Sequence, residues 1–303
     1  MIKALITGSN GFVGRHLMNE LRESGYEVFG TTRFGRNKMN ILNYEEVRSM
    51  IRSVKPDVIF HLAAIAFVPS SWQDPELTFN VNTIGSMNLF NAVRSVGIDP
   101  VIQIAGSSEE YGLVHEDEVP MDEDQPLRPL SPYAVSKIAM DYLGYQYNKT
   151  YGLKIIRTRA FNHEGYGRGE VYMPSTFAKQ VADIEAGKQK PVIKHGNLES
   201  KRDITDVRDM VRAYRMATEK CIPGEVYNIG SGKVYTAQQV LDTLVSMSEI
   251  DISFELDPKR LRPSDVKILE SNSTKFRNQT GWEPTHKIED TLSETLRYWR
   301  ERA

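Results

Sequence analysis

The sequence predicts an α/β fold in which a doubly wound parallel sheet is joined to a smaller mixed α/β lobe toward the C-terminus. Short apolar runs alternate with helical patterns through the first half of the chain. The runs are nearly continuous, as in strands that are buried on both faces of a parallel sheet. A glycine-rich turn separates the first run from the first helical pattern. These features predict repeated strand-helix-strand units with right-handed crossovers.

The expected elements alternate along the chain. Strands are expected at 2–8, 26–32, 56–64, 100–108 and 153–162, and helices at 11–25, 44–55, 76–97 and 131–152. After about residue 162 the rhythm loosens into stretches rich in Gly, Pro and charge, with short helices at 174–188 and 235–247. We therefore expect a main domain over 1–162 and a smaller lobe over 163–303. Part of the lobe, 196–235, is expected to return one strand to the main domain.

Composition argues against several classes of protein. The 303 residues include 38 basic and 40 acidic side chains, a net charge of -2, so nucleic acid and anionic membranes are poor default partners. A single cysteine, Cys221, excludes an internal disulfide, and the six histidines show no metal-ligand spacing. We see neither a signal-peptide pattern nor an apolar run of ~18 residues, and therefore expect a cytoplasmic location.

The first strand leads into "TGSNGFVG", which places Gly8, Gly11 and Gly14 before a helix. A tight turn, a close approach to a pyrophosphate and close helix packing each need a missing side chain there. A glycine trio can also be an ordinary flexible turn. In this strand-turn-helix context it predicts a Rossmann-type dinucleotide site over 1–162, which leaves the lobe to bind substrate.

The second strand carries the signal for the type of dinucleotide. At its end this strand lacks the Asp or Glu that binds a ribose 2′-hydroxyl, and it has Thr32 and Arg33 there instead. A guanidinium suits a 2′-phosphate, with Arg36 as a possible second contact, so NADP(H) is favoured and NAD(H) stays open. The alternative is a solvated surface arginine.

Further along, "SPYAVSK" places Tyr133 and Lys137 four residues apart, on one face of a helix. An ammonium beside a phenol favours the phenolate and lowers its pKa, which makes the phenol a proton shuttle. Such pairs are common in helices. After a glycine-rich loop, alternating strands and the serine pair of "GSSEEYG" at 106–112, however, this pair is a specific signal.

At this point the chain resembles the extended short-chain dehydrogenase/reductases that act on nucleotide sugars. The resemblance runs through "TGSNGFVG", "HLAA" at 61–64, "NVNTIG" at 81–86, "SSEEYG", "SPYAVSK" and "FN" at 161–162. It implies a catalytic triad of Ser107, Tyr133 and Lys137. It also implies hydride transfer between a sugar carbon and the nicotinamide, with Tyr133 moving the proton, Ser107 holding the same oxygen and Lys137 binding the nicotinamide ribose.

The same resemblance assigns cofactor contacts around the glycine loop and the neighbouring strands. They are Gly8, Asn10, Gly11, Phe12, Val13, Gly14, Thr32, Arg33, Asn40, Ile41, Leu62, Ala63, Ala64, Tyr133, Lys137, His163 and Arg168. One departure concerns Asn40, which stands where the family usually has Asp beside the adenine. Its amide keeps a carbonyl acceptor but loses the charge.

Three later stretches, at 161–169, 196–211 and 261–266, resemble the GDP-mannose branch of that family. The resemblance implies substrate contacts by Ser108, Glu109, Asn162, Arg202, Arg262 and Asp265. Arginine forks suit the two negative charges of a nucleoside diphosphate. The alternative is that each arginine pairs with the acids beside it in the sequence.

The branch contains 4,6-dehydratases and 4-keto-6-deoxy-sugar reductases, and both activities stay open. By this resemblance, the dehydratases have a catalytic base at the position of Glu109 and a further acid at the position of Ser108. In an extended segment Ser107 and Glu109 would share one side, whereas Glu110 would face a structural partner or solvent. The short link between the second strand and Asn40, and serine rather than threonine at 107, favour reduction of GDP-4-keto-6-deoxy-D-mannose to GDP-D-rhamnose.

Other outcomes also remain open. A C4 epimerase or dehydrogenase would use the same triad, and a relative that binds NADP without turnover is a different class that nothing in the sequence motivates. Many relatives form homodimers through two helices, which here are 78–96 and 133–151. Both are richer in apolar residues than a solvated helix requires, so we expect a homodimer.

Overall fold

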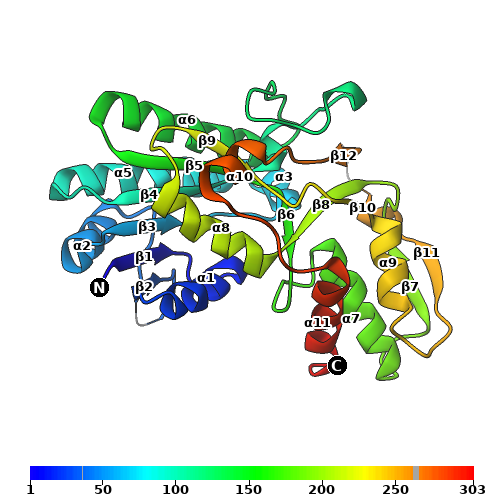
Figure 1. The fold of residues 1–303 in the computed structure, drawn as a ribbon. Coiled ribbons are helices and arrows are strands. Elements are labelled where there is room, and N and C mark those ends of the chain that lie inside the picture. Colours follow the sequence, from blue (N-terminus) through cyan, green and yellow to red (C-terminus); the bar gives the residue numbers. More distant parts are fainter. Residues whose placement is uncertain (36, 262–265) are drawn as a thin grey trace.

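The computed structural model describes residues 1–35, 37–261 and 266–303, and its main feature is a parallel six-stranded sheet (Figure 1). The strands lie in the order β2-β1-β3-β4-β5-β9. Their bounds are β1 Lys3–Thr7, β2 Glu27–Thr31, β3 Val58–His61, β4 Val101–Ser107, β5 Lys154–Ala160 and β9 Val226–Ile229. The predicted α/β fold with a doubly wound parallel sheet is confirmed.

Helices cover both faces of this sheet, because neighbouring residues of a strand point to opposite faces. Ala4 and Ile6 pack in the core beneath α1 and α8, whereas Leu5 packs beneath α2, α5 and α6. The helix bounds are α1 Phe12–Glu23, α2 Tyr44–Val54, α5 Gly85–Val96, α6 Pro132–Tyr151 and α8 Val207–Lys220. Burial of nearly every strand residue on both faces explains the continuous apolar runs of the sequence.

Local signals in the sequence define the ends of these helices. The side chain of Asn43 accepts from the backbone N–H of Glu46 and begins α2. Ser131 does the same for α6, which has Pro132 in its first turn and ends at Gly152 in a left-handed conformation. α6 carries Tyr133 and Lys137 near its start, so this N-terminus helps to place the predicted catalytic pair.

The helix expected at 76–97 is divided in the structure. α4 spans Pro75–Phe79, a π-helical turn (η1) spans Asn80–Ile84, and α5 continues from Gly85. α3, Val68–Gln73, precedes α4, and its C-cap Asp74 caps α4. Single π turns within helices are often found beside functional sites.

The remaining elements form two smaller sheets with their own helices (Figure 1). β8 pairs with β10, β12 and β6, while β7 pairs with β11. The strand bounds are β6 Asn162–Glu164, β7 Val192–His195, β8 Lys201–Asp206, β10 Val234–Thr236, β11 Ser253–Leu256 and β12 Ile268–Leu269. The helices of these sheets are α7 Met173–Glu185, α9 Ala237–Val245 and α11 Ile288–Arg300. α10, Thr274–Thr280, instead packs on α8 and β9. The short 3-10 turns are η2 Ser108–Glu110, η3 Glu116–Glu118 and η4 Pro258–Arg260.

Two aromatic residues near the C-terminus depart from the predicted division of the chain. Phe276 and Trp282 were expected in the smaller lobe, but both are fully buried in the core cluster of the large sheet, with Met210 of α8. β9, by contrast, is the returning strand that was predicted within 196–235, and it lies beside β5 in the large sheet. The chain therefore returns to the main sheet twice after residue 162, and the boundary between domains at 162 stays a prediction.

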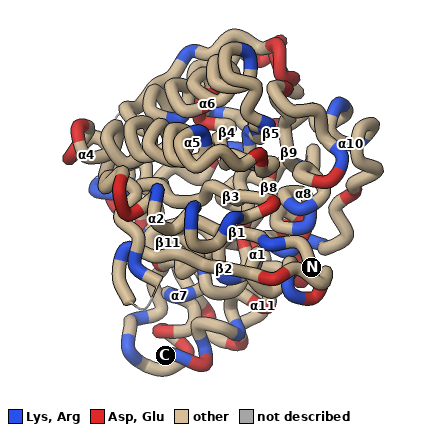
Figure 2. The backbone as a smooth tube through the Cα atoms, turned by 90° about the vertical axis from the view of Figure 1, so that its left-hand side faces the viewer, with Lys and Arg blue, Asp and Glu red and all other residues tan. Residues whose placement is uncertain are grey.

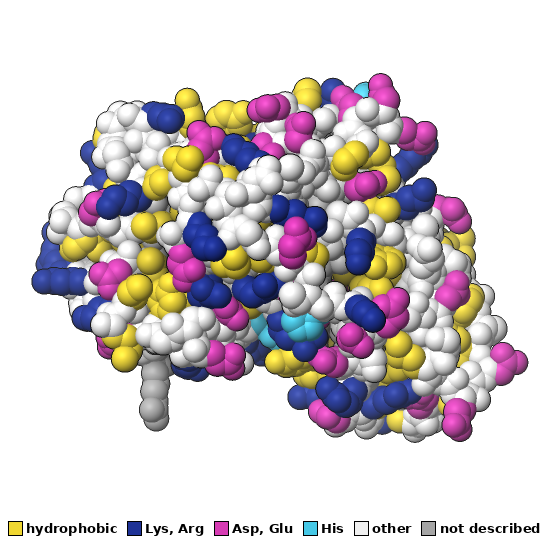
Figure 3. All heavy atoms as spheres, in the orientation of Figure 1, with side chains coloured by type: hydrophobic (Ala, Val, Ile, Leu, Met, Phe, Trp, Pro, Cys, Tyr) yellow, Lys and Arg dark blue, Asp and Glu magenta, His cyan; other side chains and the backbone are white. Residues whose placement is uncertain are grey.

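Charged side chains of both signs are mixed over the surface. Figure 2 shows basic and acidic residues interspersed along the tube, and Figure 3 shows basic side chains across the middle of one face with acidic ones among them. Within the described residues, no helix is both long and apolar enough to cross a membrane.

Candidate active site

The carboxyl ends of β1 and β3 bring the glycine-rich turn against the "HLAA" segment. Gly8 has a φ of +73°, and a Cβ there would lie 3.0 Å from the backbone nitrogen of Ala63. The hydroxyl of Thr7 accepts from the backbone N–H groups of Leu62 and Ala63, at 3.2 and 3.1 Å. The two predicted cofactor segments are thus in direct contact, with Ala64 following them.

The start of α1 is built to receive an anion. A Cβ at Gly14 would lie 2.5 Å from the carbonyl oxygen of Gly8, so only glycine lets the helix approach the turn this closely. Gly11 is the N-cap, and no side chain of a described residue caps the helix. The N–H groups of its first turn, which begins with Phe12 and Val13, are therefore left for a ligand such as a phosphate.

Residues 163–172 lie against this turn and contact it through aromatic side chains. The guanidinium of Arg168 lies 4.8 Å from the ring centre of Phe12 and 3.7 Å from that of Tyr172. His163 stacks on Phe12 at 6.3 Å, and burial lowers the pKa of His163 to about 3. The buried Nε of Arg168 has no hydrogen-bond partner within the described part of the chain. This donor is a fitting contact for a phosphate oxygen.

The adenosine end of the predicted site is an open hollow beside β2. Asn10 and Thr32 line it, together with Arg22 and Asn37, which the sequence analysis missed. Arg33 is exposed, and its guanidinium lies 5.5 Å from the ring centre of Phe34, which also lines the hollow. Arg36 lies outside the described residues.

The predicted adenine contacts lie just beyond this hollow. The Asn40 side-chain oxygen already accepts from the backbone N–H of Leu42 at 3.1 Å, which leaves one lone pair for another donor. Ile41 is 7% exposed and packs in the core, where a Cβ at Gly85 would meet it. Ile41 was predicted only as a cofactor contact, and its role in the core was not predicted.

The structure brings the three triad residues together. Ser107 ends β4, while Tyr133 and Lys137 lie one turn apart on α6. Ser107 lies close enough to the Tyr133 phenol to lower the pKa of that phenol. Lys137 Nζ lies 5.8 Å from the ring centre of Tyr133 and donates to the carbonyl oxygen of Ala105 at 2.8 Å. A reactive oxygen of a ligand could therefore meet a hydroxyl from each element.

Burial sets the charge of the pair. It raises the pKa of Tyr133 above its usual range, an effect that the contact with Ser107 opposes. It lowers the pKa of Lys137 to about 8, against the attraction of Glu110. We expected the ammonium to lower the pKa of the phenol, but in the structure burial outweighs that effect. Tyr133 therefore keeps its proton through the neutral range, in the form that can donate it.

The residues after Ser107 do not continue as an extended segment. Ser108–Glu110 form the 3-10 turn η2, so the predicted alternation of sides is wrong here. Glu109 is half-buried and faces a pocket, Ser108 is only 3% exposed, and Glu110 is completely buried. A turn places side chains at intervals of about 120°, not 180°, which separates Glu109 from Glu110.

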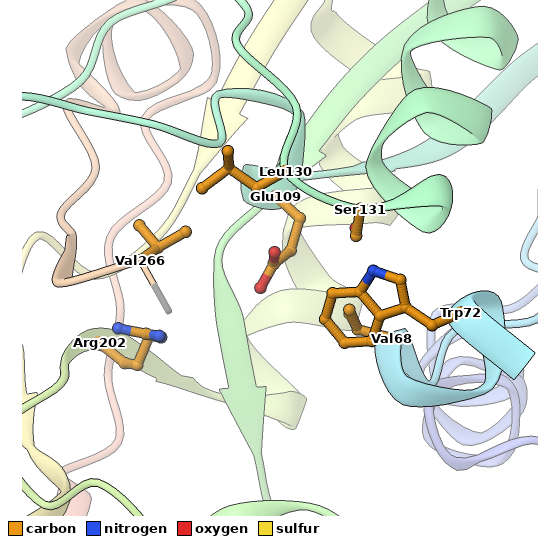
Figure 4. Close-up of a pocket in the computed structure, with 7 residues that line it drawn as sticks. All are labelled: Val68, Trp72, Glu109, Leu130, Ser131, Arg202 and Val266. Carbon is orange, nitrogen blue, oxygen red and sulfur yellow. The ribbon is translucent and has the colours of Figure 1, made fainter. Parts of the chain in front are cut away.

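The pocket next to the triad is shown in Figure 4. The Glu109 carboxylate points into it between Arg202 of β8 on one side and Trp72 of α3 on the other. Its other lining residues are Val68, Leu130, Ser131 and Val266. Arg202 is 8% exposed and also donates to the carbonyl oxygen of Lys201 at 2.9 Å. Carboxylate, guanidinium and indole together suit a polar ring that carries a charged group.

Two predicted substrate residues meet this pocket, two do not, and two lie outside the described residues. Glu109 and Arg202 line it, whereas Ser108 is buried behind it. Asn162 is exposed on β6, where it is in register with Ile204 of β8. Arg262 and Asp265 lie outside the described residues.

Trp72 was missed by the sequence analysis. It stands outside every recognised motif, in a six-residue helix, α3, that periodicity does not detect. Ser131 could have been predicted from the sequence, because it is the first residue of "SPYAVSK", the motif of the catalytic pair. It serves two purposes, as the N-cap of α6 and as a wall of the pocket.

Comparisons with known proteins agree with this geometry. The chain is 28% identical to the GDP-6-deoxy-D-mannose reductase of Pseudomonas aeruginosa, over 99% of this chain and 98% of the relative. It is 29% identical to the GDP-mannose 4,6-dehydratase of Yersinia enterocolitica, over 98% and 93%. The solved structure of RMD from Pseudomonas aeruginosa complexed with NADPH superposes with a TM-score of 0.93, at 27% identity and over 100% of both chains. Residues 5–295 match the family described as GDP-mannose 4,6 dehydratase, and the chain belongs to this family.

Proposed function

We propose that the protein reduces GDP-4-keto-6-deoxy-D-mannose to GDP-D-rhamnose with NADPH. NADPH, held at the start of α1 and beside β2, would supply the hydride that C4 of the sugar accepts. Tyr133 donates its phenolic proton to the C4 oxygen, so the carbonyl becomes a secondary alcohol. Ser107 donates a hydrogen bond to the same oxygen and orients it. Lys137 supplies positive charge beside Tyr133 as the phenolate forms, and Tyr133 then regains a proton from solvent.

The observation that favours a reductase over a dehydratase is the length of the alignments. The match with the Pseudomonas aeruginosa reductase extends over 302 positions, nearly the length of this chain. The match with the Yersinia enterocolitica dehydratase needs 350 positions to cover 98% of the same 303 residues. The dehydratase therefore carries segments that this chain lacks, whereas the reductase carries hardly any.

The cofactor assignment rests on two groups of residues. The uncapped start of α1 and the buried Nε of Arg168 suit the pyrophosphate. Thr32 lines the hollow beside β2, and the exposed Arg33 follows it in the chain. We assign Arg33 to the 2′-phosphate of NADPH, by a charge-assisted contact. The remaining loop residues that the sequence suggested stay predictions as individual contacts.

The substrate assignment is carried by Arg202 and Glu109. A guanidinium on the wall of the pocket suits the diphosphate, and a carboxylate beside the triad suits a sugar hydroxyl. Asn162, Arg262 and Asp265 stay predicted contacts of the nucleotide, and Ser108 stays a predicted contact of the sugar. Ser108 is the first residue of η2 and is buried, so in this structure it supports the turn.

The second candidate is GDP-mannose 4,6-dehydratase, which Glu109 favours. A carboxylate two residues after Ser107 that faces the neighbouring pocket could remove the proton at C5 after oxidation at C4. Elimination of water at C6 would then need an acid, and the hydride would return to the same sugar. Such an activity consumes no NADPH, which separates the two candidates experimentally.

The experiment incubates the protein separately with GDP-mannose and with GDP-4-keto-6-deoxy-D-mannose plus NADPH, and follows product masses. The proposal expects a gain of two hydrogens on the second substrate and no change in the first. Loss of water from GDP-mannose without added reductant would establish the dehydratase instead. Turnover of a UDP or dTDP sugar alone would contradict the GDP assignment.

We also propose that the protein is a homodimer that pairs through α6 and α4. Large apolar side chains are exposed on both helices, with Tyr142 at 54%, Tyr145 at 42% and Phe79 at 39%. α4 and α6 pack side by side, so these side chains belong to one region of the surface. α5, the other helix expected at the interface, presents no large exposed hydrophobic residue. The cytoplasmic location stays a prediction from the sequence.

A further inference from the structure

A buried carboxylate lies directly behind the triad. Glu110 is 0% exposed, and its Oε1 accepts from the backbone N–H of Ser107 at 2.7 Å. Gly106 makes room for it, because a Cβ there would lie 2.6 Å from this oxygen and 2.7 Å from the carbonyl oxygen of Thr158. The first glycine of "GSSEEYG" is therefore needed for the second glutamate. A fully buried carboxylate in this position calls for an explanation beyond packing.

The other oxygen of Glu110 faces a cation that holds a second acid. Oε2 lies 3.3 Å from Nε of Arg159 and makes no hydrogen bond within the described part of the chain, so this contact is a pairing of charges. The same Nε donates to Oδ2 of Asp141 at 2.9 Å. Asp141 also accepts from Arg157 at 2.6 Å. Arg159, with 4% of its side chain exposed, thus bridges Glu110 and Asp141.

This bridge joins the two elements that carry the triad. Asp141 follows Tyr133 and Lys137 on α6 at intervals of four residues, so all three lie along one face of the helix. Glu110 belongs to the turn that follows Ser107. Arg159 belongs to β5, and its side chain contacts both the turn, through Glu110, and the helix, through Asp141. We call the ion-paired set Glu110, Arg159 and Asp141 the triad bridge.

We propose that Glu110 is a positioning residue of the redox reaction: through the triad bridge it fixes the Ser107 hydroxyl relative to Tyr133 and Lys137. The bond to the Ser107 amide sets the backbone from which that hydroxyl projects. The ion pair to Arg159 and Asp141 ties this backbone to α6. The inference rests on the triad chemistry of the proposed function and not on the identity of the sugar.

Two physical arguments support it. Burial of charged side chains costs stability even when they are paired. The three residues of the triad bridge and Arg157 are nevertheless all buried behind the active site, which indicates that they specify its geometry. Proton transfer and carbonyl binding demand that two hydroxyls converge on one oxygen, and a displacement of about 1 Å can lower a rate about 100-fold. Burial and the neighbouring Asp141 raise the pKa of Glu110 to about 8, and Arg159 opposes this shift. In its ionised form Glu110 raises the pKa of Lys137 against the effect of burial.

The test compares Glu110→Leu with Glu110→Gln on any nucleotide sugar that the wild-type protein oxidises or reduces. Leucine removes the acceptor for the Ser107 amide, so kcat should fall about 100-fold while KM for the sugar and Kd for NADPH stay within about twofold. Glutamine keeps an acceptor oxygen of the same reach, so its kcat should lie about 10-fold or more above that of the leucine variant. Asp209→Asn is the matched control, because Asp209 of α8 is equally buried but accepts from the backbone N–H groups of Thr285 and His286 and, within the described residues, makes no hydrogen bond or ion pair with the triad bridge. It should lower Tm and leave kcat unchanged.

A leucine variant with a lowered Tm and wild-type kcat would overturn the proposal and leave Glu110 a stabilising residue only. Equal kcat in the leucine and glutamine variants, or parallel loss of NADPH affinity, would also overturn it. If the leucine variant does not fold, Glu110→Asp takes its place: the charge remains but the shorter side chain cannot hold the Ser107 amide, so kcat must fall below that of Glu110→Gln. Lack of turnover by the wild-type protein would count against the proposed function and not against this inference.

Discussion

Lys137 lies one helical turn after Tyr133, with its ammonium 5.8 Å from the centre of the phenol ring and 2.8 Å from the carbonyl oxygen of Ala105. The carbonyl anchors the ammonium to β4, the strand that ends at Ser107. The proton donor, its electrostatic partner and the oxygen-binding serine are therefore held on two packed elements. Each of the following predictions depends on this arrangement.

The variant Tyr133→Phe removes the proton donor. We expect kcat for NADPH-dependent reduction to fall about 1,000-fold, within the range that general acid catalysis contributes. Binding of NADPH, measured by fluorescence, should stay within about threefold, because the glycine-rich turn is unchanged. Tyr145→Phe on the exposed side of the same helix is the control and should retain full activity. Wild-type turnover by Tyr133→Phe would contradict the assignment of the proton donor.

The reduction rate should fall as the pH rises through about 8. Burial lowers the pKa of Lys137 to about 8, so the ammonium is present below this pH and lost above it. Below it, kcat should be nearly independent of pH until other groups titrate. Lys137→Met should be slow and should show no fall near pH 8. A fall of the same size and midpoint in Lys137→Met would assign it to another group.

Arg33→Ala tests the choice of cofactor. Loss of the guanidinium should raise KM for NADPH about 10-fold or more, since a charge-assisted contact to the 2′-phosphate is removed. KM for NADH provides the internal control and should change little, because NADH has no 2′-phosphate. An equal rise of KM for NADPH and NADH would mean that Arg33 does not bind the 2′-phosphate.

Glu109→Gln separates reduction from dehydration. Reduction of the 4-keto sugar needs no base at this position, so kcat should stay within about 10-fold of wild type. Any release of water from GDP-mannose should disappear in the same variant. Glu116→Gln, an exposed glutamate further along the chain, is the control. Loss of reduction by about 1,000-fold in Glu109→Gln would place this carboxylate in the reductive step itself.

Tyr142→Arg tests the proposed dimer. A charge in the centre of an apolar interface should shift the protein to a monomer in sedimentation experiments, with Tm reduced. Phe254→Arg replaces an apolar side chain of 40% exposure on β11, away from α6, and should leave the assembly unchanged. A monomeric wild-type protein, or a dimeric Tyr142→Arg, would exclude this interface.

The sequence predicted the sheet and the triad because both depend on short, regular patterns. Continuous apolar runs indicated the strands, and the spacing of Tyr133 and Lys137 indicated one helix face. The different surroundings of Glu109 and Glu110 were also predicted, with Glu110 facing a structural partner or solvent, but from an extended segment where the structure has a 3-10 turn. Trp72 and Arg159 were missed because their roles arise from contacts between distant segments, which no local pattern records.

The most direct test of the central claim uses NADPH that carries deuterium at the transferable position of the nicotinamide. Incubation with GDP-4-keto-6-deoxy-D-mannose should give a GDP-sugar with one deuterium, located at C4, and Tyr133→Phe should give almost none. Product that forms without deuterium at C4, or water loss from GDP-mannose in the absence of added NADPH, would contradict the assignment of this protein as a C4 reductase.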